Sequence, residues 1–565
     1  MNSGSLSAVR VLLISTYELG HQPLYPASAA GVLEHAGHEV RIADLSLEGL
    51  DEDLLAWSEA VAISVPMHTA LRLALEAMPS IKALAPDLPV CIFGLYAGVG
   101  MALEELDPYL AANASGTHLA EPSRSPGETG TQAQAQAQAQ PQAGATHRLA
   151  GGSWRRSATG FDAAIAGETG PELLAWLSEI SDATGNLEPA CETLPGSAGG
   201  YSDDLPFPSV RVSLGRAPAP GLPARHLLPP LASYAKLALG DQEILAGYVE
   251  ASHGCAHRCR HCPVPVVYDG RTRLVALDQL MADIDQLVGL GARHISFGDP
   301  DFLNGPRHAM RVIDAFHSTF PELTFDATVK VEHIIRHAGD LWGGMPTWQR
   351  FSQAGCLFVT SAFESTNDVV LDHLAKGHTR ADEQEAVGIL RQAGIEPRPS
   401  FVPFTPWTLR EDILDILDLV AEMDLVGNLD PVQLSIRLLV PPGSLLIRSG
   451  HLEGMLGPYD PDHLGYPWRS PDPVLDELQL ELSQIAERAA EAGWSPDDAY
   501  QALREAVCER LSLPGSARLK PSPLPGYRSP LPPASRPRLT EAWFCCAEPT
   551  RSQRLLVGTA GCSCP

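Results

Sequence analysis

Positive charge is scarce in this 565-residue sequence, and lysine is its scarcest source. Lysine occurs only at positions 82, 236, 330, 376 and 520. The 40 lysine and arginine residues are outnumbered by 68 aspartate and glutamate residues, which leaves a formal net charge of −28. Binding to a phosphate backbone needs a basic surface, and no stretch of the sequence forms one. The sequence therefore excludes a protein whose partner is nucleic acid.

Long hydrophobic runs are also missing. No apolar stretch reaches the roughly 18–20 residues that span a bilayer, and the first 20 residues hold too short an apolar stretch for a signal peptide. We therefore expect a cytoplasmic protein with no membrane partner. In that compartment the 11 cysteines are more typical of metal or redox chemistry than of a disulfide framework.

The first part of the chain alternates short apolar runs with helical patterns. Strands are expected at 9–15, 61–66 and 91–96, with helices between them. This alternation predicts an α/β domain over residues 8–185, with a doubly wound, flavodoxin-like parallel sheet. Residues 113–157 interrupt it with a polar Gln-Ala repeat that cannot bury a core, so we expect a disordered low-complexity insertion there.

A second series of strand and helix patterns follows a Pro-rich stretch. Its six expected strands, the last at 432–440, fit a partial (β/α)6 barrel better than a complete eight-stranded one. The remaining boundaries follow from composition: a Pro-rich linker at 186–243, the barrel at 244–450, a helical region at 451–512, a second Pro-rich linker at 513–540 and a cysteine-bearing tail at 541–565.

Three cysteines lie close together directly after the first expected barrel strand. The segment HGCAHRCRHCP places Cys255, Cys259 and Cys262 in a C-x3-C-x2-C arrangement. Three thiolates on one tight loop can hold three irons of a [4Fe–4S] cluster and leave the fourth iron open to a chelating ligand. The alternative is zinc, bound by these cysteines together with His253, His257 or His261. The asymmetric spacing of the three cysteines argues against zinc, because structural zinc sites usually have four ligands in paired knuckles.

With this loop, residues 245–450 resemble the radical SAM superfamily. The resemblance implies that the open iron chelates S-adenosylmethionine (SAM) and that one electron from the reduced cluster cleaves it to a carbon radical. The segment GDPDF (298–302) resembles the family's Gly-Gly-Glu motif, which receives the SAM amino group; Gly298 matches, whereas Asp299 replaces a glycine. The residue before the third cysteine is usually aromatic and packs near the adenine, and here it is His261.

Three further residues are candidates for the SAM pocket. Ser361 and Glu364 lie in SAFES (361–365), at the end of the fourth expected strand, where the alternative is a capped strand end with a surface carboxylate. Arg437, on the sixth expected strand, could bind the SAM carboxylate or a substrate anion with its bidentate guanidinium. A structural ion pair is an equal alternative for Arg437.

A doubly wound domain ahead of such a barrel resembles the cobalamin-binding domain of cobalamin-dependent radical SAM enzymes. The resemblance implies that a corrin edge or nucleotide tail lies at the carboxyl ends of the strands, where Glu18, Gly20, His21, Ser64 and Gly94 are found. The Asp-x-His-x-x-Gly motif that supplies an axial histidine is absent. The alternative is a degenerate domain that binds no cofactor and only shapes the active site.

The end of the chain carries four more cysteines. WFCCAEP (543–549) resembles the tail of a small group of radical SAM proteins named for a CUAEP/CCAEP ending, in which the first tail position can be selenocysteine. That exchange implies a soft nucleophile or redox group, so Cys545 and Cys546 are candidate catalytic residues. Cys562 and Cys564 lie beyond the motif and are weaker candidates.

The sequence thus predicts a radical SAM enzyme with a [4Fe–4S] cluster, SAM and cobalamin as cofactors. We expect it to methylate or otherwise modify a small-molecule or metalloid substrate with help from the tail thiols, and the resemblance implies a flavodoxin- or ferredoxin-type electron donor. One alternative is cobalamin-independent radical transfer to a thiol-bound arsenic or selenium species. Another, of a different class, is a non-catalytic redox sensor or carrier.

Overall fold

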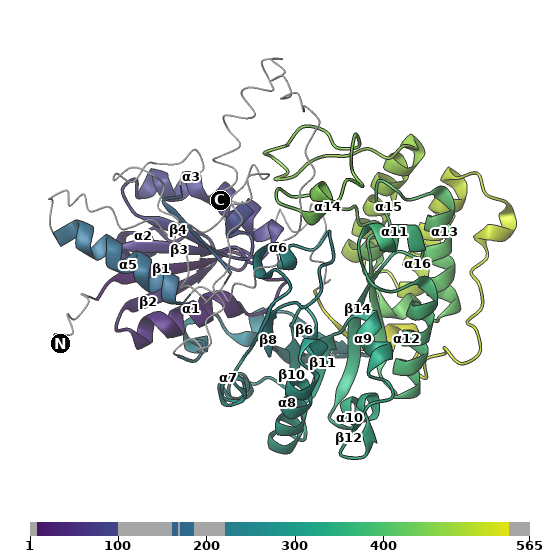
Figure 1. The fold of residues 1–565 in the computed structure, drawn as a ribbon, viewed down its shortest axis with the longest axis horizontal. Helices are drawn as coiled ribbons and strands as arrows, with labels where there is room; N and C mark the ends of the chain where they lie inside the picture. The colour runs from purple at the N-terminus through teal and green to yellow at the C-terminus, as the bar shows by residue number, and fades with distance from the viewer. Residues whose placement is uncertain (1–7, 100–160, 168–169, 186–220, 542–565) are drawn as a thin grey trace, which may run out of the picture.

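Two α/β units lie side by side in the protein (Figure 1). The structure, a computed structural model, describes residues 8–99, 161–167, 170–185 and 221–541. The expected insertion at 113–157 and the tail cysteines lie outside the described residues.

The first unit is the expected doubly wound domain. Its parallel sheet has the order β2-β1-β3-β4-β5, so the strand order reverses beside β1, where ligands bind in such folds. The strands are β1 (Arg10–Ser15), β2 (Glu39–Asp44), β3 (Ala60–Ser64), β4 (Val90–Gly94) and β5 (Ala163–Ala166). The helices are α1 (Leu24–His35), α2 (Glu52–Trp57), α3 (His68–Leu84) and α5 (Gly170–Gly185).

Burial on both faces explains why β1 is apolar without alternation. Val11 and Leu13 enter the core under α1 and α5, whereas Leu12 and Ile14 enter the core on the opposite face, under α2 and α3. A parallel sheet covered by helices on both sides needs apolar side chains at successive positions, not at alternate ones. The run RVLLIS therefore forms a central strand.

The second unit is a curled sheet with the order β15-β14-β11-β10-β7-β6-β16. The five strands from β15 to β7 run parallel, and β6 and β16 extend the sheet antiparallel. The strands of this sheet are β6 (Lys236–Leu239), β7 (Gln242–Val249), β10 (His294–Phe297), β11 (Thr324–Thr328), β14 (Cys356–Glu364), β15 (Glu396–Phe401) and β16 (Arg538–Leu539).

Helices and two short hairpins complete the second unit. The hairpins pair β8 (Ser252–Gly254) with β9 (Thr272–Leu274), and β12 (Leu341–Trp342) with β13 (Met345–Pro346). The helices are α6 (Val264–Tyr268), α7 (Leu277–Gly289), α8 (Pro306–Thr319), α9 (Val331–Arg336), α10 (Thr347–Gln353), α11 (Asp368–His373), α12 (Arg380–Gln392), α13 (Arg410–Glu422), α14 (Leu445–Arg448), α15 (Pro473–Glu491) and α16 (Pro496–Arg510).

The α/β fold class is confirmed, but the sixth expected barrel strand is not a strand. Residues 432–440 begin in a 3-10 turn and meet the sheet edge through an isolated bridge between Phe404 and Arg437. The partner segment holds Pro403 and Pro406 on either side of Phe404. Proline has no N–H to donate, so the ladder cannot extend in either direction.

The first expected linker does not reach 243. The strand β6 begins at Lys236, and residues 221–235 already pack against both units. The buried Arg225 pairs with Asp283 of α7 at 2.8 Å and donates to the backbone oxygen of Tyr248. Side-chain anchors of this kind hold a Pro-rich backbone that has few hydrogen bonds of its own.

The second expected linker, 513–540, is also a packed segment. The Arg536 guanidinium is buried and binds Asn428 at 2.7 Å and the Asp424 carboxylate at 2.9 Å. Pro537 then accepts a hydrogen bond from Arg398 of β15, and β16 pairs with β6 at the other edge of the sheet. We call residues 513–541 the strap, because they join the two edges of the curled sheet.

Removing the main anchor of the strap is expected to destabilise the second unit. Arg536→Ala removes the buried guanidinium that binds the half-buried Asp424 carboxylate and the buried Asn428 amide, and loss of such hydrogen bonds typically costs about 1–3 kcal/mol. Calorimetric unfolding should show a clear drop in the melting temperature. Lys520→Ala is the matched control, because Lys520 lies in the same strap and makes a solvent-accessible pair with Asp497 worth no more than about 1 kcal/mol. Equal effects of the two changes would contradict the anchoring role.

The two units meet at the carboxyl ends of their strands. The His21 ring, after β1, stacks on Tyr248 of β7 with ring centroids 4.6 Å apart. The Tyr25 hydroxyl donates to the Glu250 carboxylate at 3.2 Å. These contacts put the ligand-binding edge of the first sheet against the barrel. No helix within the described ranges is long and apolar enough to cross a membrane.

Candidate active site

The three cysteines of the cluster loop, residues 255–262, follow β8 at the carboxyl end of the barrel sheet. Cys255 and Cys259 are buried, Cys262 is half-buried, and none of the three forms a disulfide bond. The loop begins at Gly254, whose φ of +74° places any Cβ within 2.4 Å of the Arg271 backbone oxygen. Only glycine fits this turn.

The electrostatics of the loop distinguish its cysteines. Burial raises the pKa of Cys255 to about 12, and burial also raises the pKa of Cys259, although Lys376 and Lys330 oppose the shift at Cys259. Thiols must lose their protons to bind iron, so cluster assembly releases protons here. The two lysines favour the resulting negative charge.

Three buried side chains that form ion pairs with one another hold the cluster loop in place. The His261 Nε2 and the Lys376 Nζ each lie 3.1 Å from Oε1 of Glu364, and all three residues are buried. Burial alone would raise the pKa of Glu364, but Lys376 and His261 hold it at about 2. Glu364 ends β14 with a φ of +70°, a strained conformation for a non-glycine residue. The group therefore ties the cluster loop to β14 and to the segment after α11.

Glu364→Gln is expected to lower the iron content of the purified protein. The change leaves the buried Lys376 charge unpaired, at a typical cost of about 3–5 kcal/mol, and weakens the support of His261. Iron analysis and thermal unfolding measure both effects. Glu364→Gln combined with Lys376→Met removes both charges and should recover much of the lost stability. If the single variant keeps full iron and loses only SAM affinity, Glu364 is a SAM ligand and not a support of the loop.

The GDPDF segment follows β10, and its first acidic residue, Asp299, is hydrogen-bonded within the fold. A Cβ at Gly298 would lie 2.0 Å from the Tyr248 hydroxyl, so the backbone passes directly against that ring. The buried Asp299 carboxylate accepts hydrogen bonds from the Ala251 N–H at 2.9 Å and the Ser252 hydroxyl at 2.6 Å. Burial raises the pKa of Asp299 to about 7. The two hydrogen bonds of Asp299 therefore hold Ala251 and Ser252, which precede the cluster loop, in place.

Ser361 and Arg437 differ in what their side chains contact. The Ser361 hydroxyl on β14 is buried and has no hydrogen-bond partner within the described residues. A buried polar atom without a partner favours a ligand contact. Arg437, in contrast, pairs with Asp476 at 2.7 Å and lies over the Trp468 ring at 3.6 Å. The structural ion pair that the sequence left open is the one observed for Arg437.

The candidate cobalamin residues form the carboxyl edge of the first sheet. The buried Glu18 carboxylate caps α1 through the Leu24 N–H at 2.8 Å and accepts the Ser64 hydroxyl at 3.2 Å. Burial raises the pKa of Glu18 to about 8 and lowers that of His21 to about 4. Gly94 has a φ of +118° and approaches the Val65 carbonyl. Glu18 and Ser64 hold the edge together, and His21 is an uncharged ring stacked on the barrel.

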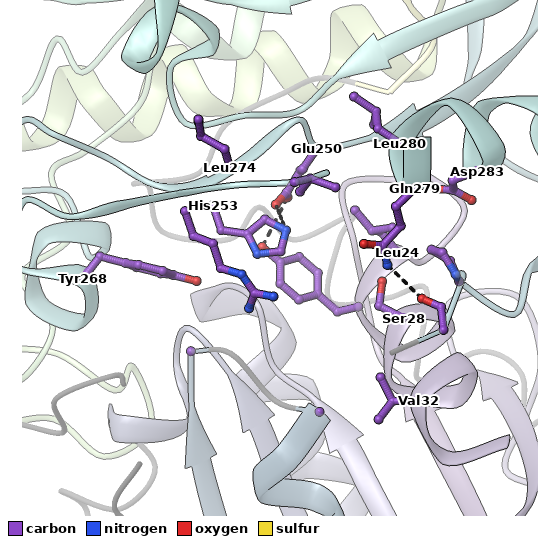
Figure 2. Close-up of a pocket in the computed structure, with 17 residues that line it drawn as sticks. Leu24, Ser28, Val32, Glu250, His253, Tyr268, Leu274, Gln279, Leu280 and Asp283 are labelled. Carbon is purple, nitrogen blue, oxygen red and sulfur yellow. Dashed lines mark hydrogen bonds and ion pairs between the residues drawn. The ribbon is translucent and has the colours of Figure 1, made fainter. Parts of the chain in front are cut away.

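The helix α6, which follows the cluster loop, connects the loop to this edge of the first sheet. Its Val267 and Tyr268 pack against Leu95, the residue after Gly94. A cavity of about 120 Å³ lies nearby, between α1 and the barrel. Figure 2 shows Leu24, Ser28 and Val32 of α1 facing it from one side, and Glu250 and His253 from the other.

The end of the strap also reaches the edge of the first sheet. The Tyr17 hydroxyl donates to the Glu541 carboxylate at 2.7 Å, and the Glu541 side chain covers Gly20. Glu541 is the last described residue, so the candidate thiols Cys545 and Cys546 lie outside the described residues.

Residues 249–420 match the profile of the Radical SAM superfamily. The chain contains a radical SAM domain. The matched range includes the cluster loop, GDPDF and Glu364, and it excludes Arg437 and the strap. No curated protein matches the sequence.

Solved structures with the same architecture include cobalamin-dependent radical SAM enzymes. OxsB with aqua-cobalamin and S-adenosylmethionine bound has a TM-score of 0.55 and 13% identity, over 90% of this chain and 72% of that one. OxsB with aqua-cobalamin has a TM-score of 0.52 and 14% identity, over 85% and 67%. The methyltransferase TsrM from Kitasatospora setae has a TM-score of 0.49 and 15% identity, over 80% and 78%. The OxsB comparison supports the arrangement of a doubly wound domain before the radical SAM domain.

Proposed function

We propose that this protein is a radical SAM enzyme that cleaves S-adenosylmethionine at a [4Fe–4S] cluster and uses cobalamin to modify a small molecule, most simply by methylation. One observation carries the proposal: the helix that follows the three-cysteine loop packs against the carboxyl edge of the doubly wound sheet, at Leu95. A cofactor on that edge would lie next to the cluster. OxsB, of similar fold, is described with aqua-cobalamin and S-adenosylmethionine bound.

The donor set of the cluster loop fits a [4Fe–4S] cluster. Cys255, Cys259 and Cys262 would hold three irons. When bound, the cluster supplies one electron to SAM. The residues of the chain have separate roles. Glu364 holds His261 in place, and Asp299 holds the backbone before the loop. We assign the Ser361 hydroxyl, which has no hydrogen-bond partner within the described residues, to SAM or substrate.

We assign the cobalamin site to the carboxyl edge of the first sheet, where Glu18, Gly20, His21, Ser64 and Gly94 lie. The space beside Gly20 is occupied by the Glu541 side chain, and the space beside Gly94 by the Val65 carbonyl, so neither glycine is assigned as a direct contact of the cofactor. His21 is stacked on Tyr248 and uncharged, and Glu18 caps a helix, so neither is assigned as an axial ligand.

The tail thiols are assigned to the same site. Cys545 lies four residues beyond Glu541, which is anchored to Tyr17 at the edge of the first sheet. In this assignment Cys545 and Cys546 act on an intermediate after the radical has formed.

Spectroscopy of anaerobically purified protein tests both cofactors at once. Absorption and electron paramagnetic resonance spectra should show a [4Fe–4S] cluster and, after addition of hydroxocobalamin and removal of the excess, about one bound corrin. The reduced protein should release cleaved SAM products over several turnovers. Stoichiometric oxidation of the cluster without released products would identify a redox sensor instead, and absence of bound corrin would leave a cobalamin-independent radical enzyme.

A further inference from the structure

A second group of metal-ligating side chains lies beside the cluster loop. His257, Asp301 and His333 each place one ring nitrogen or carboxylate oxygen within 4.8 Å of the others. They come from three segments: His257 from the cluster loop after β7 and β8, Asp301 from the loop after β10, and His333 from α9 after β11. These strands are neighbours in the order β7-β10-β11, so the sheet itself brings the three side chains together.

The three candidate ligand atoms lie close together, and their contacts with one another do not have the geometry of hydrogen bonds. Nδ1 of His333 lies 2.6 Å from Oδ2 of Asp301, and Nε2 of His257 lies 3.6 Å from the same oxygen. All three atoms are buried, and none makes a hydrogen bond of normal geometry to another described group. The two imidazole nitrogens can donate to the Asp301 oxygen only when each carries a proton on that side, and a buried carboxylate without those donors is costly. A cation between the three atoms would offset that cost.

The surroundings hold the ligands in place for a cation. The other carboxylate oxygen of Asp301 accepts the Leu303 N–H at 3.2 Å, which fixes the orientation of the side chain. Nδ1 of His257 faces the Glu332 carboxylate at 3.7 Å, and that carboxylate also binds Lys330 at 2.7 Å. Histidines that bind metals usually present their second ring nitrogen to a carboxylate or carbonyl. The Glu332 carboxylate has this position relative to Nδ1 of His257.

We propose that His257, Asp301 and His333 bind one divalent transition-metal ion. Two imidazoles and one carboxylate suit a borderline cation such as Zn²⁺ or Fe²⁺, with water completing the coordination. Because His257 lies between Cys255 and Cys259, the ion would tie the cluster loop to the segments after β10 and β11. The site needs neither a cluster nor cobalamin, so the proposal stands independently of the proposed function.

The test uses the full-length chain without its other metal-binding cysteines. Cys255, Cys259 and Cys262 are changed to Ala, and Cys545, Cys546, Cys562 and Cys564 to Ser, so that neither the cluster loop nor the tail can bind zinc through thiolates. Zn²⁺ is titrated against a chromophoric chelator, and the bound metal is counted after gel filtration. We expect one equivalent of Zn²⁺, and a Co²⁺ spectrum without a sulfur-to-metal charge-transfer band.

Single changes then locate the ion. Asp301→Asn and His333→Ala should each weaken Zn²⁺ binding by more than the roughly 10–100-fold that loss of an outer partner costs. His337→Ala is the control, because its ring lies 5.5 Å from His333 and its Nδ1 pairs with Asp340 instead. Circular dichroism checks the fold of each variant, and His257→Gln replaces any variant that does not fold.

Two results would overturn the metal site. One is the absence of a stoichiometric equivalent of Zn²⁺ in the background that lacks the seven loop and tail cysteines, which would leave His257, Asp301 and His333 as an ionic group only. The other is unchanged Zn²⁺ affinity in Asp301→Asn and His257→Gln, which would place the ion elsewhere.

Discussion

Cys259→Ala is expected to abolish SAM cleavage and to reduce protein-bound iron sharply. Three thiolates are the minimum that holds a [4Fe–4S] cluster with one open iron, and with two the cluster is neither retained nor positioned. Iron and sulfide analysis, electron paramagnetic resonance of the reduced protein and chromatography of SAM products measure the loss. Cys255→Ala and Cys262→Ala should behave in the same way.

Cys508→Ala is the matched control for the cluster variants. Cys508 is also buried, but it lies on α16, far along the chain from the cluster loop. Its removal should cost only packing energy and leave iron content and SAM cleavage unchanged. Full iron and full SAM cleavage in Cys259→Ala would reject the cluster assignment for the C-x3-C-x2-C loop.

Changing both tail thiols is expected to separate SAM cleavage from product formation. In the double variant Cys545→Ser and Cys546→Ser, the cluster loop is intact, so cluster content and uncoupled SAM cleavage should stay at parent levels. Product formation should be lost, because serine neither binds a soft atom nor forms a disulfide nor gives up a hydrogen atom readily. The substrate can be found from mass changes in metabolite extracts treated with the parent enzyme but not with Cys259→Ala.

The remaining tail cysteines provide the control for that experiment. Cys562 and Cys564 lie beyond the CCAEP motif, and their replacement by Ser should leave turnover unchanged. If the Cys545 and Cys546 double variant forms product at the parent rate, the tail takes no part in the reaction. Loss of cluster content in that variant would instead indicate that the tail stabilises the metal site.

Features that depend only on residues close together in the sequence could be predicted. The spacing of Cys255, Cys259 and Cys262 predicts a metal-binding loop, because all three thiols lie within one short segment of the chain. Alternating apolar runs likewise predicted both α/β units, since a strand buried on two faces has the same composition wherever the sheet places it. Gly298 could be recognised for the same reason, as part of a short motif after a strand.

Contacts between distant segments were decided only by the tertiary structure. Glu364 is a partner of Lys376 and His261, and Asp299 supports the backbone at Ala251, because parallel strand order brings the ends of β7, β10 and β14 together. Arg437 pairs with Asp476, which no local pattern indicates. A proline-rich composition predicts an extended backbone but not whether side chains anchor it. Arg225 does so in residues 221–235, the described part of the first expected linker that precedes β6, and Arg536 does so in the second.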